Sequence, residues 1–313
     1  MPSSTSNSEL RPASRAIAVL LAGLFLYCAT LEVVTRLGVS RVSRIQRRIY
    51  QDLAAARSLA PQASNAQPTM LVVGNSLLLD GVDRASLKKD LAPNYQLTVL
   101  PIENTQFEDW YFGLRRLFRE GSRPTVVVVC LSTRQMMSRA TDGEYFAYYL
   151  MQGRDLFAVR RESQLDNTMT SAYFFAHRSD WLGSRAQIRN WLLQEIMPNL
   201  ERLIGFFPGK TPPMPPKDQI IAGVIPHLLA LNDLCKSNGA RLVVLVPPTL
   251  SHDDASAAVQ DSAAREGVSA LVPLRPGDVS PTDFYDGFHL NSGGAARFTH
   301  RLASELLQRL TAN

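Results

Sequence analysis

Short apolar runs alternate along most of the chain with longer segments that have helical spacing. The apolar runs are residues 69–73, 96–100, 125–131, 241–246 and 270–274. The segments with helical spacing are residues 80–91, 107–118, 219–238, 253–266 and 292–310. Continuous apolar runs of this length indicate strands that are covered on both faces. The alternation predicts an α/β fold with a doubly wound, flavodoxin-like parallel sheet of about five strands, which binds ligands at its carboxyl ends.

A longer apolar run lies near the N-terminus. Residues 16–34 contain one charged side chain, Glu32, and follow two arginines. This length matches the hydrocarbon thickness of a bilayer, so we predict a single transmembrane anchor, preceded by a disordered segment at residues 1–15. A cleaved signal peptide is the alternative interpretation. It is less favoured because no small-x-small site follows and Tyr27 before Cys28 does not fit a lipobox.

Residues 35–68 are predicted to connect the anchor to the α/β domain. Four apolar residues recur there at helical spacing among arginines: Val42, Ile45, Ile49 and Leu53. This pattern predicts an amphipathic helix, which either lies on anionic headgroups or docks on the α/β domain. Residues 60–68 are rich in Ala, Pro, Gln, Asn and Ser and are predicted to be a linker.

Residues 134–217 interrupt the alternation and are predicted to form a helical insertion in a domain that spans residues 69–313. A helix is expected near residues 184–204, followed by a proline-rich stretch at 208–216. The aromatic residues of the insertion include Tyr145, Phe146, Tyr148, Tyr149, Tyr173, Phe174, Phe175, Trp181 and Trp191. Aromatic rings can stack on sugars, so a lid or glycan groove is one interpretation; packing inside a helical subdomain is the other, and we favour it.

Composition narrows the function classes. The chain is 45% hydrophobic and 19% charged, as in ordinary globular proteins, and its net charge of +5 is concentrated beside the predicted anchor. This distribution favours a membrane-proximal face over nucleic-acid binding. Cys28, Cys130 and Cys235 form no disulfide framework, and no metal-ligand spacing is present. We predict no metal, cofactor or nucleic-acid partner.

Two short motifs stand near opposite ends of the α/β segment. Gly74, Asn75 and Ser76 end the first apolar run at a sharp strand-to-helix turn, which would lift Ser76 onto the carboxyl edge of the sheet. Asp286 and His289 precede the closing helix. A serine nucleophile needs a base within reach and a third group that orients the base. We therefore predict a catalytic triad of Ser76, His289 and Asp286.

These motifs resemble the first and last blocks of the SGNH (GDSL-type) hydrolases. The resemblance covers the chain from about residue 69 to the C-terminus, apart from the insertion. It implies an SGNH-type fold in which Ser76 attacks an ester carbonyl, His289 takes the serine proton, and Asp286 holds the correct tautomer of His289.

The chain departs from the family at the oxyanion hole. The typical member has a Gly after the second strand and a Gly-x-Asn-Asp after the third, whereas this chain has Ile-Glu-Asn-Thr at 102–105 and Leu-Ser-Thr-Arg at 131–134. We predict that Asn104 replaces the missing donor, beside the backbone N–H of Ser76. Three residues are predicted to line the pocket wall: Asn75, Thr133 and Arg134.

Similar departures occur in envelope SGNH proteins that work beside a membrane-bound O-acyltransferase. The resemblance therefore implies a membrane-anchored serine esterase or O-acetyltransferase that acts on envelope or extracellular polysaccharide. Its partners would be the membrane, a glycan substrate, and a membrane-bound O-acyltransferase or polysaccharide synthesis proteins. Two alternatives remain, a free-standing esterase or lipase and a non-catalytic scaffold of a polysaccharide export machine.

The charges and the resemblance disagree on orientation. Five arginines follow the apolar run: Arg36, Arg41, Arg44, Arg47 and Arg48. The positive-inside rule alone would leave the large domain in the cytoplasm. Anchored SGNH proteins of bacterial envelopes often carry a Glu-x-x-x-Arg segment after the anchor, here Glu32 to Arg36, and face outward. We expect a single-pass inner-membrane protein with a periplasmic domain.

Overall fold

The computed structural model describes residues 10–61, 66–197, 213–250 and 255–311. Four predictions fall partly outside these ranges: the disordered N-terminal segment, the linker, the later part of the insertion, and the start of the helix expected at residue 253. The proposed domain boundaries stay a prediction.

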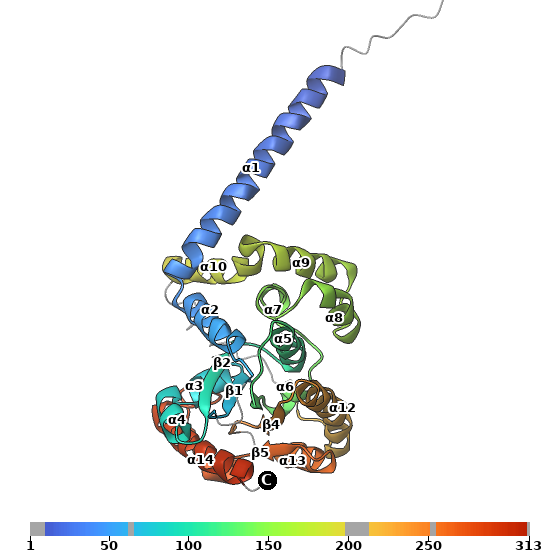
Figure 1. Ribbon diagram of the computed structural model, residues 1–313. Helices are drawn as coiled ribbons and strands as arrows, with labels where there is room; N and C mark the ends of the chain where they lie inside the picture. The colour runs from blue at the N-terminus through green and yellow to red at the C-terminus, as the bar shows by residue number, and fades with distance from the viewer. Residues whose placement is uncertain (1–9, 62–65, 198–212, 251–254, 312–313) are drawn as a thin grey trace, which may run out of the picture.

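Five parallel strands form one sheet (Figure 1). They are β1 (Thr69–Gly74), β2 (Gln96–Pro101), β3 (Val126–Cys130), β4 (Arg241–Leu245) and β5 (Ser269–Leu271). Their order, β2-β1-β3-β4-β5, confirms the predicted doubly wound, flavodoxin-like arrangement. Because successive side chains of a strand point to opposite faces, Leu71 and Val73 enter one core while Met70 and Val72 enter the other.

Helices cover both faces of this sheet (Figure 1). They are α3 (Ser76–Gly81), α4 (Arg84–Leu91), α5 (Phe107–Arg119), α6 (Thr133–Met137), α12 (Lys217–Lys236), α13 (Ser256–Arg265) and α14 (Ser292–Thr311). α3, α4 and α14 pack on one face, and α5, α12 and α13 pack on the other. Two 3₁₀ turns, η2 (Pro276–Asp278) and η3 (Pro281–Asp283), lead towards α14.

The prediction of a single helix at residues 80–91 is wrong, because α3 ends within this range and α4 begins there. Asp83 interrupts the helical backbone and accepts hydrogen bonds from the N–H groups of Ala85 and Ser86, at 3.0 and 3.3 Å. An aspartate that accepts from the first turn of a helix acts as an N-cap, so Asp83 starts α4 instead of continuing α3.

The N-terminal part of the chain forms two helices, α1 (Leu10–Val42) and α2 (Arg44–Arg57). α1 contains a stretch, Ser14–Val39, that is long and apolar enough to cross a membrane. α2 buries Ile49, Leu53 and Ala56 in the core beside the sheet, whereas Ile45 is exposed and Val42 belongs to α1. Of the two interpretations of this amphipathic pattern, docking on the α/β domain therefore describes α2.

The predicted insertion is helical over its described part. It contains α7 (Gly143–Tyr149), the 3₁₀ turn η1 (Gly153–Asp155), α8 (Leu156–Glu162), α9 (Asn167–Arg178) and α10 (Asp180–Ile196). Phe146, Tyr149 and Tyr173 are buried and pack among themselves or with their neighbours. Other aromatic residues of the insertion, including Phe174 and Phe175, remain exposed. Packing thus accounts for only part of the aromatic content.

Candidate active site

Ser76 is the first residue of α3 and follows β1 after one residue, Asn75. The ends of β1 and β3 approach closely before this turn, since a Cβ on Gly74 would come within 2.6 Å of the carbonyl oxygen of Cys130. The side chain of Asn75 is fully buried, accepts from the N–H of Leu77 and donates to the carbonyl of Thr105, both at 3.0 Å. Asn75 thereby fixes the turn that presents Ser76 and ties it to the loop after β2.

The loop between η3 and α14 carries His289 and Asp286. One carboxylate oxygen of Asp286 accepts hydrogen bonds from the backbone N–H groups of Phe288 and His289, at 2.9 and 2.7 Å. The other oxygen lies 2.6 Å from Nδ1 of His289. Gly287 between them has φ of +81°, a conformation that favours glycine. The loop therefore fixes the imidazole by its backbone as well as by the carboxylate.

The two loops meet at the carboxyl end of the sheet. Nε2 of His289 lies 3.0 Å from Oγ of Ser76, although 213 positions separate the residues in the sequence. Ser76, His289 and Asp286 thus form one chain of contacts. In the tautomer that donates from Nδ1 to the carboxylate, Nε2 is free to accept the hydroxyl proton. Hydroxyl, base and orienting carboxylate are the parts that nucleophilic acyl transfer requires.

The environment of Asp286 keeps it ionised. Its partial burial favours the neutral form, but the hydrogen bonds from the backbone and imidazole of His289 and from the N–H of Phe288 outweigh burial and lower the pKa of Asp286 below its usual value. The side chains of His289 and Asp286 are 20% and 41% exposed. Both side chains are therefore partly accessible to solvent.

Two aromatic residues that the motif analysis missed surround His289. The ring of Tyr285 stacks on the imidazole with 5.6 Å between centroids and 12° between planes, and Phe288 meets the imidazole edge-on. The hydroxyl of Tyr285 donates to Asp80 of α3 at 3.1 Å. Partial burial and the nearby carboxylates raise the pKa of Tyr285 to about 12, so the hydroxyl remains a donor at neutral pH. The sequence could have indicated them, because Tyr285 directly precedes the Asp-x-x-His motif and Phe288 lies within it.

Asn104 lies in the loop between β2 and α5, exposed, and has φ of +61°. Left-handed backbone is usual for glycine and tolerated by asparagine. The next residue, Thr105, accepts the hydrogen bond from Asn75 that holds the Ser76 turn. Within the described part of the chain, no acceptor is bonded to the backbone N–H of Ser76 or of Asn104.

A cavity of about 500 Å³ lies beside the two loops. Its lining includes Leu77, Thr133, Arg134, Pro247, Gly287 and Phe288. Thr133 and Arg134 begin α6, which follows β3 after two residues, and both side chains line this cavity. Asn75 does not line this cavity, because its amide points into the protein and is bonded there.

The remaining histidines stand apart from this arrangement. Nδ1 of His227 lies 2.6 Å from the carbonyl of Met136, and the ring stacks on Phe107. Nδ1 of His177 lies 3.1 Å from the carbonyl of Ala147. His300 is exposed on α14, and His252 lies outside the described residues. In the ranges that the structure describes, no group of His, Cys, Asp and Glu side chains could hold a metal ion.

Comparison with known proteins gives distant structural similarity alone. No family model matches the chain, and no curated protein matches it. TesA is 15% identical with a TM-score of 0.37, over 76% of this chain and 97% of TesA. The lipopolysaccharide acetyltransferase periplasmic domain of Salmonella ser. Paratyphi A is 9% identical with a TM-score of 0.40, over 85% and 98% of the two chains.

The acetyl xylan esterase Est2A of Butyrivibrio proteoclasticus is 10% identical with a TM-score of 0.37, over 80% of this chain and 66% of Est2A. These proteins are similar to the chain in fold at most. The chain resembles the SGNH-type hydrolases in its two motifs and in its doubly wound five-stranded sheet.

Proposed function

We propose that the protein is a serine acyl-ester hydrolase or O-acetyltransferase of SGNH type that acts on cell-envelope or extracellular polysaccharide. The observation that carries this proposal is the continuous contact from Ser76 Oγ to His289 Nε2, at 3.0 Å, and from His289 Nδ1 to Asp286, at 2.6 Å. A hydroxyl, an imidazole and an ionised carboxylate in this order are the working parts of covalent acyl transfer.

In the proposed reaction, His289 takes the Ser76 proton as Oγ attacks the ester carbonyl of the acyl donor. The backbone N–H of Ser76 and the side-chain amide of Asn104 would hydrogen-bond the oxyanion of the tetrahedral intermediate. His289 then gives its proton to the leaving alcohol, and an acyl-enzyme forms on Ser76. Water or a sugar hydroxyl, deprotonated by His289, attacks the acyl-enzyme and regenerates the serine. Asp286 stabilises the imidazolium in both steps.

The proposal also includes a membrane anchor. In the stretch of α1 that would cross the bilayer, the side chains of residues 14–28 are exposed, and those apolar side chains are not covered by the domain. An exposed apolar helix of this length is suited to a bilayer, whereas a core helix of a soluble domain would be covered. We propose a single pass through the inner membrane with the domain on the periplasmic side, in keeping with the envelope proteins that the motifs resemble.

The test uses the full-length protein in detergent with an aryl acetate as donor and a de-O-acetylated envelope polysaccharide as acceptor. We expect a covalent acetyl group on Ser76 by intact mass and peptide mapping, and its transfer to the glycan by NMR. Ser86→Ala, an exposed serine of α4, is the matched control and should become acetylated on Ser76 as the wild type does.

Other outcomes would favour the alternatives. Fast hydrolysis of aryl esters without transfer to glycan would indicate a free-standing esterase. Absence of any acyl-enzyme, together with normal glycan acetylation in a Ser76→Ala strain, would indicate a scaffold.

The oxyanion hole gives a separate prediction. We expect Asn104→Ala to lower kcat by about 10²–10³-fold with little change in KM, since an oxyanion donor acts mainly in the transition state. Asn104→Gly distinguishes a donor in the side chain of residue 104 from one in its backbone. Glycine keeps φ of +61° without strain, so retained activity would assign the donor to the backbone N–H, and lost activity would assign it to the side-chain amide. Full activity of both variants would exclude the side-chain amide of Asn104 from the oxyanion hole.

A further inference from the structure

α10 is fastened to the N-terminal helix at Glu32. The carboxylate of Glu32 accepts hydrogen bonds from the hydroxyl of Ser179 at 2.7 Å and from the backbone N–H groups of Asp180 and Trp181, at 2.9 and 3.2 Å. Arg36, one turn along α1, bonds to Asp180 at 3.0 Å. A carboxylate at these donors caps a helix N-terminus and complements its dipole. The start of α10 therefore lies at the level of Glu32 on α1.

This attachment lies inside the stretch that would cross the membrane, Ser14–Val39. Side chains at residues 14–28 are exposed, and α1 packs against α10 from about Ala29 onward. At 1.5 Å per residue, residues 14–28 rise about 22 Å, less than the hydrocarbon core of about 30 Å. A bilayer crossed by α1 would thus extend to the level at which α10 is attached.

α9 and α10 lie across the end of the domain from which α1 projects (Figure 1). Their inner face packs on α7: Tyr173 and Ala176 are buried, and a Cβ on Gly183 would come within 2.5 Å of the Tyr148 ring. Away from that face the two helices expose large apolar side chains. We call this set the platform: Phe174, Phe175, Trp191, Leu192 and Ile196.

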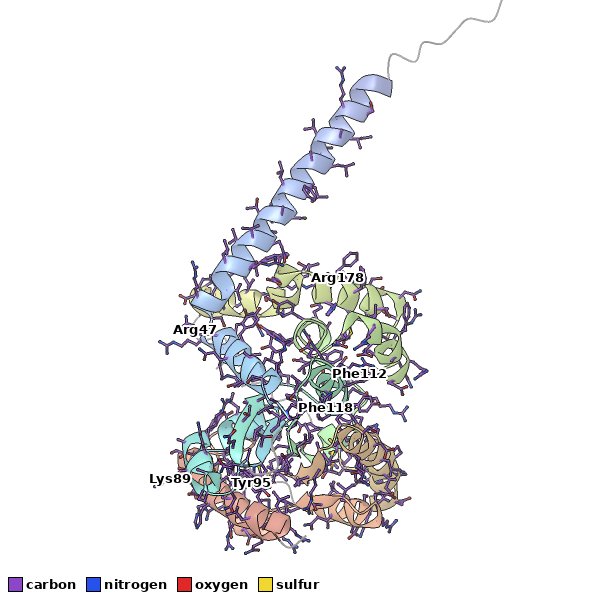
Figure 2. All side chains as sticks on the ribbon, in the orientation of Figure 1. Arg47, Lys89, Tyr95, Phe112, Phe118 and Arg178 are labelled. Atoms are coloured by element: carbon purple, nitrogen blue, oxygen red, sulfur yellow. The ribbon has the colours of Figure 1, made fainter. Side chains whose placement is uncertain are left out.

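The composition of the platform is that of an interfacial surface. Phe175 and Ile196 are 55% and 74% exposed. The guanidinium of Arg178 lies over the Phe174 ring, 5.8 Å from its centroid, and Figure 2 shows Arg178 at the end of the domain from which α1 leaves. Aromatic and aliphatic side chains beside an arginine suit the boundary between acyl chains and anionic headgroups.

An apolar groove of about 240 Å³ continues the platform to α1. Its lining includes Leu31, Val34 and Val39 of α1, and Trp181, Ile188 and Trp191 of α10. A second cavity, of about 500 Å³, shares Thr35 and Val39 with this groove and is also lined by Arg36, Arg41 and Arg47. Apolar surface beside arginines matches the chemistry of one phospholipid, with an acyl chain in the groove and its phosphate towards the arginines.

We propose that the platform lies in the headgroup–acyl boundary of the bilayer that α1 crosses. The protein then contacts the membrane twice, by the spanning helix and by the platform. The inference rests on the membrane anchor of the proposed function. Two contacts joined through Glu32 fix the tilt of the domain, and hence the height of Ser76 above the membrane, which a single helix would leave free.

The test is site-directed spin labelling of the full-length protein in vesicles of phosphatidylethanolamine and phosphatidylglycerol. Cys28→Ser removes the exposed cysteine, and Cys130 and Cys235 are buried. Single labels are placed at Phe175→Cys and Ile196→Cys. Phe25→Cys in α1 and Lys89→Cys, at the opposite end of the domain in Figure 2, are the lipid and water references. Frequent collision of the spin label with oxygen indicates that the label lies in lipid, and frequent collision with a water-soluble nickel complex indicates that it lies in water.

We expect labels at 175 and 196 to lose collisions with nickel and gain collisions with oxygen relative to the label at 89. If the labels at 175 and 196 are in water while the label at 25 is in lipid, the platform does not contact the membrane, but the membrane anchor is still supported. If the label at 25 is in water, α1 does not cross the membrane, and both the anchor and the platform proposals are contradicted. Thermal unfolding at the wild-type midpoint verifies that each variant is folded, and all four labelled positions are exposed.

Discussion

Replacing Ser76 or His289 with Ala is expected to lower acyl transfer by roughly 10⁴–10⁶-fold, and the double variant should be scarcely worse than either single variant. Ser76 Oγ and His289 Nε2 lie 3.0 Å apart. In the proposed mechanism they act in one step, because the hydroxyl attacks as the imidazole removes its proton. Loss of either partner stops this step, so a second substitution can lower the rate only slightly further. The measurement is kcat/KM for an aryl acetate and for glycan acetylation.

A matched histidine control exists on the protein surface. His300 on α14 lies 4.0 Å from Asp90 and its side chain is 85% exposed, so it is a second His–Asp pair without a serine partner. His300→Ala should leave the rate unchanged. Losses in the two single variants that add in the double variant would contradict a concerted triad. Unchanged glycan acetylation in a Ser76→Ala strain, with loss on deletion of the whole protein, would favour the scaffold.

The sheet and the meeting of its two motifs could be predicted because they depend on local sequence patterns and on one topological rule. Unbroken valine in residues 126–129 indicates a central strand, and alternation with helices indicates parallel pairing. Parallel strands end at the same edge, so a serine after β1 and a histidine before α14 were expected to be near each other. The 3.0 Å contact agrees with that expectation.

Features that depend on backbone dihedrals were not accessible in this way. Asn104 was selected by its place after β2, yet its φ of +61° cannot be read from an Asn between Glu and Thr. Asn75 was expected on the pocket wall because it neighbours Ser76. In the structure the turn rotates its amide inward, where it bonds Thr105 and caps α3.

Contacts between distant segments were equally hidden. In the sequence, Glu32 stands out only as the one charged side chain of the predicted anchor, but its partners at Ser179, Asp180 and Trp181 lie about 150 positions away along the chain. Tyr285 pairs with Asp80, 205 positions away. No sequence periodicity or motif links the two members of such a pair, because each contact is created by packing between helices and loops that are distant in the sequence.

Asp286→Asn is expected to lower kcat/KM by about 10⁴-fold while the domain remains folded. The amide oxygen of Asn can still accept from the N–H groups of Phe288 and His289, which the carboxylate now holds at 2.9 and 2.7 Å. Its NH₂ group would then face Nδ1 of His289 and donate to it. Nδ1 would become the acceptor and Nε2 would carry the proton, so the imidazole could no longer take the proton of Ser76.

The lowered pKa of Asp286 gives this variant a pH signature in stability. A carboxyl group whose pKa is lower in the folded state stabilises the fold above its unfolded pKa, and this contribution is lost as pH falls through the folded value. Wild type should therefore unfold at a higher temperature than Asp286→Asn at neutral pH, and the two should converge in acid.

Asp278→Asn separates the tautomer effect from loop capping. Asp278 is exposed and accepts from the backbone N–H of Arg275 at 2.9 Å, so it caps the 3₁₀ turn η2 by the same chemistry but lacks a histidine partner. We expect this control to retain activity. An Asp286→Asn enzyme within tenfold of wild type would mean that the carboxylate only shapes the loop, since a histidine in the wrong tautomer cannot act as the base for Ser76.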